Sequence, residues 1–309
     1  MADKSRAVQV ATVTQDYLRG LAREEMVSKT LDRLDAASSC RPDIVCLPEL
    51  FTDSDPESVP GPMTERLALW AKAKSAYVIC PIKTEVDGRS YNSAVLIDRA
   101  GKVTGKYDKI HPTEGEMETG TCPGDLNAQV FHTDFGAIGI QICFDVNWHE
   151  VWAGLKQKGA EIVFWPSAYP AHRMLSALAW MNEYYVISST MTRGSRIYDI
   201  TGEVMAQSGM FQPWAQATLH LGKRLFEIDY HMDKIRKVEQ KYGRRVLVQF
   251  YHDEDWFALT SIDPELSTDD VIAEFEMVPI RPYHARCERA IEKARVSASA
   301  TNCSPAQGE

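Results

Sequence analysis

The stretch that decides the fold runs over residues 137–147 and reads AIGIQICFDVN. Its first six residues form an apolar run typical of a buried β-strand. Cys143 ends this run, and a turn-forming segment follows at once. This pattern predicts a thiol on a sharp turn above the edge of a sheet, where its sulfur can reach a substrate and the next backbone N–H groups can hold a developing oxyanion. A cysteine buried in the core is the alternative.

Two further segments carry charged side chains where a strand is expected to end. Residues 43–49 (DIVCLPE) read as a buried strand that finishes on Glu49, and residues 105–112 (GKYDKIHP) place Lys109 just past a short β-like stretch. Each residue by itself is also explained as a surface charge. Together with Cys143 they put a carboxylate, an ammonium group and a thiol at three strand ends. Carboxyl ends of strands in an α/β sheet gather along the rim where ligands bind.

Three segments around these residues resemble the signature blocks of the nitrilase, or carbon–nitrogen hydrolase, superfamily: 47–51 (LPELF), 109–116 (KIHPTEGE) and 139–145 (GIQICFD). The resemblance extends from about Val8 to about Asp229. It implies an α/β fold, namely a four-layer α-β-β-α sandwich.

The same resemblance implies a catalytic triad of Glu49, Lys109 and Cys143, with Glu116 as a second glutamate after the lysine. In this chemistry Glu49 takes the thiol proton and later protonates the departing amine. Lys109, as an ammonium, stabilises the tetrahedral oxyanion together with the Phe144 backbone N–H. Attack by Cys143 gives a thioester and releases amine or ammonia, and water then frees the acid. Glu116 would orient Lys109, the amide or the water, or would simply be one more charge in an acidic loop.

Composition narrows the class of protein. The chain has 309 residues, of which 44% are hydrophobic, and its net charge of −9 argues against a nucleic-acid partner. Seven cysteines without a C-x-x-C pair fit neither a disulfide framework nor a zinc site, so we expect no metal and no organic cofactor. Because the sequence has no apolar run of about 18 residues and no signal-peptide pattern at its start, we expect a cytoplasmic protein without a membrane partner.

The order of expected elements indicates one carbon–nitrogen hydrolase domain over residues 1–290, with two sheets that carry helices on their outer faces. Residues 231–290 lie mostly outside the resemblance. Because members of the superfamily commonly oligomerise, we expect this extension to contact a neighbouring subunit in a homodimer or larger homo-oligomer; packing on its own chain is the alternative. Residues 291–309 are expected to form a mobile tail.

The expected substrate is a small linear amide or an N-carbamoyl compound. Relatives that attack nitriles usually show Trp-Glu after the cysteine, whereas this chain has Phe-Asp, as in amidases and formamidases. The expected pocket residues come from the cysteine turn and from the segment 165–170 (WPSAYP): Phe144, Asp145, Trp148, Trp165, Ala168 and Tyr169. Alternatively, Asp145 caps the helix that follows, and the two tryptophans belong to the core.

Two other kinds of function stay open. A nitrilase, or an acyltransferase that passes the thioester to an amine, would use the same triad. A non-catalytic thiol sensor or binding protein would keep the fold and use Cys143 as a reactive thiol beside Lys109.

Overall fold

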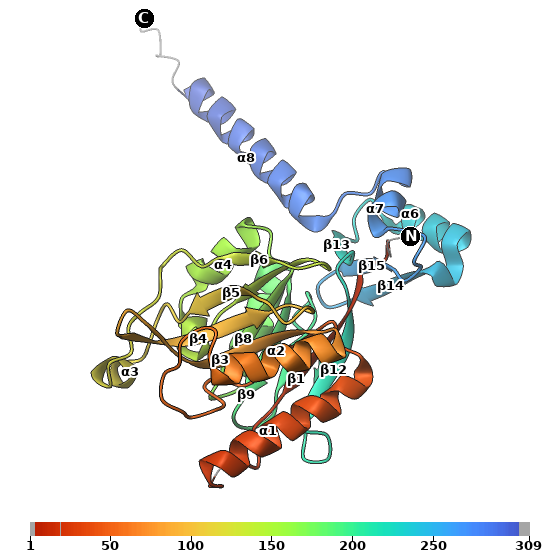
Figure 1. Ribbon diagram of the computed structural model, residues 1–309. Helices are drawn as coiled ribbons and strands as arrows, with labels where there is room; N and C mark the ends of the chain where they lie inside the picture. Colours follow the sequence, from red (N-terminus) through yellow and green to blue (C-terminus); the bar gives the residue numbers. More distant parts are fainter. Residues whose placement is uncertain (1–3, 19, 303–309) are drawn as a thin grey trace, which may run out of the picture. The chain divides into compact units, whose positions relative to one another are not determined.

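The structure is a computed structural model that describes residues 4–18 and 20–302, with side chains up to residue 296 (Figure 1). The chain separates into two compact units. One is Val8–Leu219, and the other combines Met1–Ala7 with His220–Glu309. The sequence predicted one domain up to residue 290 with an extension from residue 231, so the observed division lies slightly earlier than the predicted start of the extension.

The larger unit is built on two six-stranded sheets. The first sheet has the order β12-β1-β2-β3-β4-β5 and consists of β1 (Ala7–Val13), β2 (Ile44–Cys46), β3 (Tyr77–Val86), β4 (Arg89–Ile97), β5 (Val103–Asp108) and β12 (Trp214–His220). β1, β2 and β3 are parallel to one another, and β3, β4 and β5 are antiparallel. All three residues of β2 are buried, as expected for a short apolar strand inside a sheet covered on both faces.

The second sheet repeats this plan with the order β11-β10-β9-β8-β7-β6. Its strands are β6 (Val130–His132), β7 (Ala137–Ile140), β8 (Ile162–Ser167), β9 (Tyr185–Thr190), β10 (Arg196–Tyr198) and β11 (Val204–Gln207). β7, β8 and β9 are parallel, and the remaining pairs are antiparallel. Hydrogen bonds join the two sheets face to face: Thr12 Oγ1 donates to the Ser188 carbonyl at 2.7 Å, and Ser189 Oγ donates to the Val13 carbonyl at 2.7 Å.

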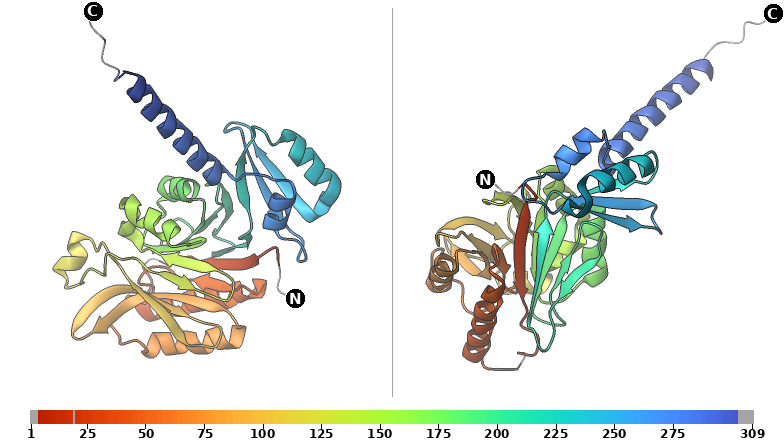
Figure 2. Two further views of the ribbon diagram at one scale, coloured as in Figure 1. Left: turned by 90° about the horizontal axis from the view of Figure 1, so that it is seen from above. Right: turned by 90° about the vertical axis from the view of Figure 1, so that its right-hand side faces the viewer.

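Helices cover the two outer faces and complete four layers. α1 (Arg23–Ala37) and α2 (Pro62–Lys74) bury apolar side chains against the first sheet. α4 (His149–Gln157) and α5 (His172–Asn182) lie on the other side, and the short α3 (Glu114–Glu118) follows β5. In Figures 1 and 2 the red and orange helices lie on one side of the paired sheets and the green helices on the other. None of the helices in the described part of the chain is long and apolar enough to cross a membrane.

The local sequence explains why α2 begins at Pro62. The chain reads Pro60-Gly61-Pro62, and Pro62 occupies the first turn, where its missing N–H is not needed. The carboxylate of Glu57 accepts hydrogen bonds from the Met63 and Thr64 backbone N–H groups at 3.1 and 3.2 Å. A carboxylate is favoured there because the N-terminal end of a helix is electropositive.

The smaller unit has a three-stranded antiparallel sheet in the order β13-β15-β14, formed by β13 (Arg224–Glu227), β15 (Trp256–Ser261) and β14 (Val246–Tyr251). Its helices are α6 (Met232–Tyr242), α7 (Thr268–Glu274) and α8 (Ile280–Asn302). Phe226, Val238 and Phe257 are central to its own apolar core.

Part of the tail that the sequence predicted as mobile is helical, because α8 continues to Asn302. The reason is local, since residues 283–302 contain neither proline nor glycine and are rich in Ala, Arg, Glu and Lys, which favour helix. Residues 303–309 lie outside the described part of the chain.

Candidate active site

Glu49 follows β2 in the middle of the first sheet. The Leu47 N–H still pairs with the Ile79 carbonyl at 3.2 Å, so the strand geometry extends almost to the glutamate. The Glu49 side chain is buried, with 4% of the residue exposed. A buried carboxylate requires a charged or hydrogen-bonding partner.

Lys109 supplies that partner. It lies just past β5, its backbone N–H bonds the Asn92 carbonyl at 2.8 Å, and only 1% of the residue is exposed. Its Nζ is 3.0 Å from Glu49 Oε1 and 2.8 Å from Glu116 Oε2. Burial disfavours the ammonium form, but the negative charges of Glu49 and Glu116 outweigh it and raise the pKa of Lys109. The lysine therefore stays charged at neutral pH.

Glu116 reaches the lysine from α3. Its side chain and that of Thr113 form a capping box, in which Glu116 Oε2 accepts from the Thr113 N–H at 2.8 Å and Thr113 Oγ1 accepts from the Glu116 N–H at 3.3 Å. Burial opposes its ionisation, but hydrogen bonds from Lys109, the Thr113 backbone and Asn92 lower the pKa of Glu116. Of the roles that the sequence left open for Glu116, contact with Lys109 is the one seen in the structure.

Asn92 joins the two glutamates and was not predicted as a site residue. Its amide nitrogen donates to Glu49 Oε1 and to Glu116 Oε1, each at 2.8 Å. It lies in β4, where Asn92 and Ser93 are buried polar residues that directly precede the apolar run of residues 94–97. That pair was the available signal, because buried polar side chains need partners.

Cys143 lies on the sharp turn that the sequence predicted. β7 ends at Ile140, and a single turn of 3-10 helix, η2 (Cys143–Asn147), begins at the cysteine. Its φ of +46° lies in the left-handed region, which non-glycine residues rarely adopt. Such strained backbone persists only where the surroundings fix it, and it is common at functional sites. Here Trp165 Nε1 holds the Cys143 carbonyl at 3.0 Å.

Asp145 fastens this turn to the lysine segment. Its carboxylate is fully buried: Oδ2 accepts from Tyr107 OH at 2.7 Å and from the Ile142 N–H at 2.9 Å. Oδ1 lies 2.9 Å from both the backbone N and the ring Nδ1 of His111. We expected Asp145 in the substrate pocket; in the structure its carboxylate binds protein groups on both of its oxygens.

The charges of Glu49 and Lys109 both affect the pKa of the Cys143 thiol. Burial and the negative charge of Glu49 raise the pKa of Cys143 to about 12, although Lys109, Ser167 and the Ala168 backbone act in the opposite direction. The resting cysteine is therefore a neutral thiol, and it needs a base to become a nucleophile. Glu49 and Lys109 are in direct contact, and both affect the pKa of Cys143, so the three predicted residues belong to one site.

Some of the expected pocket residues support the cysteine turn from inside the protein, and others are exposed at its surface. Trp165 is fully buried and holds the turn, while Trp148 stacks on His111 with ring centroids 3.7 Å apart. Phe144 is partly exposed beside Trp148, with the two rings edge to face. Ala168 is exposed.

Tyr169 is half-buried and packs edge to face on Trp165. Burial together with the negative charge of Glu49 raises the pKa of Tyr169 to about 12.

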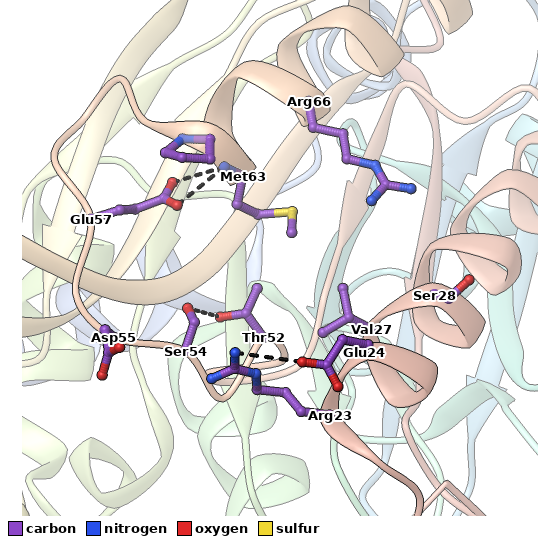
Figure 3. Close-up of a pocket in the computed structure, with 11 residues that line it drawn as sticks. Arg23, Glu24, Val27, Ser28, Thr52, Ser54, Asp55, Glu57, Met63 and Arg66 are labelled. Atoms are coloured by element: carbon purple, nitrogen blue, oxygen red, sulfur yellow. Dashed lines mark hydrogen bonds and ion pairs between the residues drawn. The ribbon is translucent and has the colours of Figure 1, made fainter.

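Two of the cavities in this unit bear on the position of the site. The larger, of about 640 Å³, is lined by α1, the loop after Glu49 and the start of α2. Figure 3 shows Arg23 and Glu24 turned toward each other on its wall and Glu57 turned to the Met63 backbone. Its lining, taken from the described residues, contains no triad member, so cavity size does not identify the reactive centre. The smaller, of about 270 Å³, is lined in part by Ala168, whose backbone interacts with the thiol.

No three histidine, cysteine, aspartate or glutamate side chains in the described ranges are grouped so that they could hold a metal ion.

Fold and site together define a hydrolase of the α-β-β-α sandwich type. The chain belongs to the carbon–nitrogen hydrolase family, whose model matches residues 7–223. It is 26% identical over 242 residues to "Omega-amidase NIT2" of Xenopus tropicalis, covering 70% of this chain and 86% of the relative. It is 30% identical over 231 residues to "Probable hydrolase YhcX" of Bacillus subtilis, covering 67% of this chain and 44% of that relative.

Solved structures agree on the fold. Saccharomyces cerevisiae Nit3, a member of the nitrilase superfamily, superposes with a TM-score of 0.61 at 20% identity and covers 79% of this chain and 97% of its own. An amidase from Nesterenkonia sp. gives a TM-score of 0.60 at 18% identity, and the match covers 76% of this chain and 96% of the amidase chain. The predicted superfamily, the four-layer fold and the assignment as a carbon–nitrogen hydrolase are confirmed.

Proposed function

We propose that the chain hydrolyses a small linear amide or N-carbamoyl compound, with Cys143 as nucleophile, Glu49 as general base and Lys109 as oxyanion stabiliser. The observation that carries this proposal is the buried contact of 3.0 Å between Lys109 Nζ and Glu49 Oε1, next to a thiol whose pKa both side chains influence. The amidase names of the relatives from Xenopus and Nesterenkonia support the choice of an amide over a nitrile.

In the first half-reaction Glu49 removes the thiol proton as the sulfur attacks the amide carbon. The C–S bond forms, the carbonyl oxygen becomes an oxyanion, and the Lys109 ammonium with the Phe144 N–H stabilises it. Collapse breaks the C–N bond, and Glu49 returns its proton to the leaving nitrogen. The products of this half-reaction are a thioester on Cys143 and free ammonia or amine.

In the second half-reaction Glu49 takes a proton from water, which attacks the thioester carbon. The C–S bond breaks, the acid leaves, and the sulfur regains its proton. Glu116 and Asn92 are positioning residues in this scheme, because both bind the groups that act on substrate. Asp145 is a positioning residue as well, since it holds the cysteine turn against the segment that carries Lys109.

Product analysis tests this proposal. The full-length protein is incubated with an amide, with the nitrile of the same carbon chain, and with the amide plus an added amine. Ammonia and acid in equal amounts from the amide alone, together with an acyl mass on Cys143 in quenched samples, support hydrolysis through a thioester. Acid from the nitrile, or transfer of the acyl group to the amine, would favour the nitrilase or acyltransferase alternatives.

The same proposal includes a cytoplasmic location and a homo-oligomer in which the C-terminal unit contacts a neighbouring subunit. A sensor role for Cys143 is less well supported, because a thiol with a raised pKa is a slow target for oxidants at neutral pH.

A further inference from the structure

The smaller cavity borders segments that also carry the candidate site. Ala168 contributes to its wall and lies three positions after Trp165, whose indole N–H donates to the Cys143 carbonyl at 3.0 Å. Gln15 of the same wall donates to the carbonyl of Phe51, two positions after Glu49, at 2.8 Å. The Ala168 carbonyl is held by Thr192 Oγ1 at 3.0 Å, and Thr192 also lines the cavity. A substrate whose carbonyl carbon reaches the sulfur therefore has this space near it.

The chemistry of the wall is distinctive. The cavity is lined by Gln15, Met26, Ala168, Met191 and Thr192, and no charged side chain of the described residues is among them. Met26 comes from α1, and Met191 follows β9. Two methionines give an apolar, adaptable surface, because the thioether chain is flexible and polarizable.

Both polar side chains of the wall are already engaged as donors, and Thr192 Oγ1 donates to the Ala168 carbonyl. The amide nitrogen of Gln15 donates to Thr30 Oγ1 at 3.0 Å and to the Phe51 carbonyl at 2.8 Å. An anionic group in the cavity would thus find no cation and few free donors in the described part of the chain. Burial of an unpaired carboxylate is strongly unfavourable, typically by several kcal/mol.

We infer that the acyl part of the substrate is uncharged and apolar and lies in this cavity against Met26 and Met191. This inference rests on the proposed amidase function and adds the class of acyl group to it. The site selects amides that end in an alkyl group and rejects amides of the same length that end in a carboxylate. A volume of about 270 Å³ suits a short aliphatic chain.

Paired substrates test this inference on the full-length protein. Butyramide and succinamate have the same number of carbons, but succinamate carries a carboxylate at the end remote from the amide. The kcat/KM for butyramide is expected to exceed that for succinamate by at least about 100-fold, which reflects the desolvation of the unpaired charge. A higher value for succinamate would overturn the inference while leaving the amidase proposal intact.

Variants of residues in the cavity wall test whether the preference for butyramide over succinamate arises in the smaller cavity. Met191→Lys is expected to lower the ratio of the two kcat/KM values by about 10-fold or more, through a gain for succinamate, because it supplies a cation that the described residues of the wall lack. Met191→Leu keeps the wall apolar and is expected to keep the ratio. If Met191→Lys does not fold, as judged by thermal melting, Met26→Lys places the cation on the opposite element.

An unchanged ratio in a folded lysine variant would show that the acyl group lies elsewhere and would overturn the inference. If neither amide yields ammonia and no acyl mass forms on Cys143, the amidase proposal itself fails, and the inference fails with it.

Discussion

The carboxylate of Asp145 lies 2.9 Å from both the backbone nitrogen and the ring Nδ1 of His111. This contact joins the cysteine turn after β7 in one sheet to the segment that follows β5 in the other sheet. Lys109 stands two residues before His111, so the distance between nucleophile and lysine depends on the contact. Because misplacement of reacting groups by about 1 Å can reduce a rate about 100-fold, we propose that Asp145 affects catalysis by positioning these two segments.

Replacement of Asp145 by asparagine tests this positioning role. An amide nitrogen cannot accept from the donors that now meet the carboxylate, so we expect a loss of about 3 kcal/mol in the free energy of unfolding. The kcat for amide hydrolysis should fall with it. Urea unfolding and steady-state kinetics measure the two effects. Asn147→Ala in the same turn removes one exposed hydrogen bond, to the Phe144 carbonyl, and should change stability by less than about 1 kcal/mol.

A Glu49→Gln variant separates the two effects of this carboxylate on Cys143. Without the general base, amide hydrolysis should fall by about 100- to 10,000-fold. Because the charge of Glu49 helps to raise the pKa of the thiol to about 12, its removal should lower that pKa. Alkylation of Cys143 should therefore begin at lower pH even though turnover is lost. Mass spectrometry of the Cys143 peptide across a pH series measures this, with Cys122 in the same protein as reference. An alkylation profile that moves to higher pH would contradict the assignment.

A Lys109→Met variant should have the opposite effect on the thiol. The ammonium lowers the pKa of Cys143, so alkylation should require higher pH than in the parent. Loss of an oxyanion donor should reduce kcat by about 100- to 1000-fold. Unfolding should also become easier by about 3–5 kcal/mol, because Glu49 and Glu116 are left buried without their cation.

Lys106→Met is the matched control for Lys109→Met. It breaks a partly exposed pair between two residues of β5, Lys106 and Asp108, whose charged groups are 2.8 Å apart, and should change stability by no more than about 1 kcal/mol. Equal losses in the two variants would argue against a special role for the buried pair.

The three residues of the proposed triad could be selected from the sequence because each lies in its own local pattern. Cys143 ends an apolar run, Glu49 ends a buried strand, and Lys109 follows a short one. The rule that strand ends gather at one rim predicts that they lie close together, and Lys109 and Glu49 are in contact. The turn at Cys143 was also predictable, since an apolar run passes there directly into turn-forming residues.

The supporting contacts could not be predicted in this way, because they depend on pairings between distant segments. Asn92 meets Glu49 and Glu116 only through the register of β4 against β5, in which Ser93 is opposite Asp108. Asp145 was predicted as a pocket residue because it lies on the cysteine turn, with a role as a helix cap as the alternative. Its partner His111 lies 34 positions away, and no local pattern connects the two.

The methionines of the smaller cavity were missed for the same reason. Met26 belongs to a helix whose apolar positions read as core, and Met191 lies just beyond a buried strand. Only the fold places both beside Ala168.

The exposed end of α8 offers a test of the predicted homo-oligomer. Every described side chain from residue 288 to residue 296 is exposed, and Ile291 and Val296 are apolar among them. If this helix contacts a neighbouring subunit, Ile291→Glu with Val296→Glu should reduce the molar mass seen by light scattering, because charges replace the apolar contact. Glu292→Gln in the same helix is the control. A parent that is a monomer, or a double variant of unchanged mass, would reject the prediction for α8.

Asn92 gives a graded test of the hydrogen bonds that order the two glutamates. Asn92→Ala removes both donors, and we expect kcat to fall about 10-fold with little change in KM, because the side chain binds Glu49 and Glu116 and not the substrate. Asn92→Asp is nearly the same size but places a third negative charge beside two carboxylates. It should therefore lower kcat further than alanine does, since the same lysine must then balance all three charges. A variant series in which aspartate is better tolerated than alanine, or in which only KM changes, would show that Asn92 does not act through the glutamates.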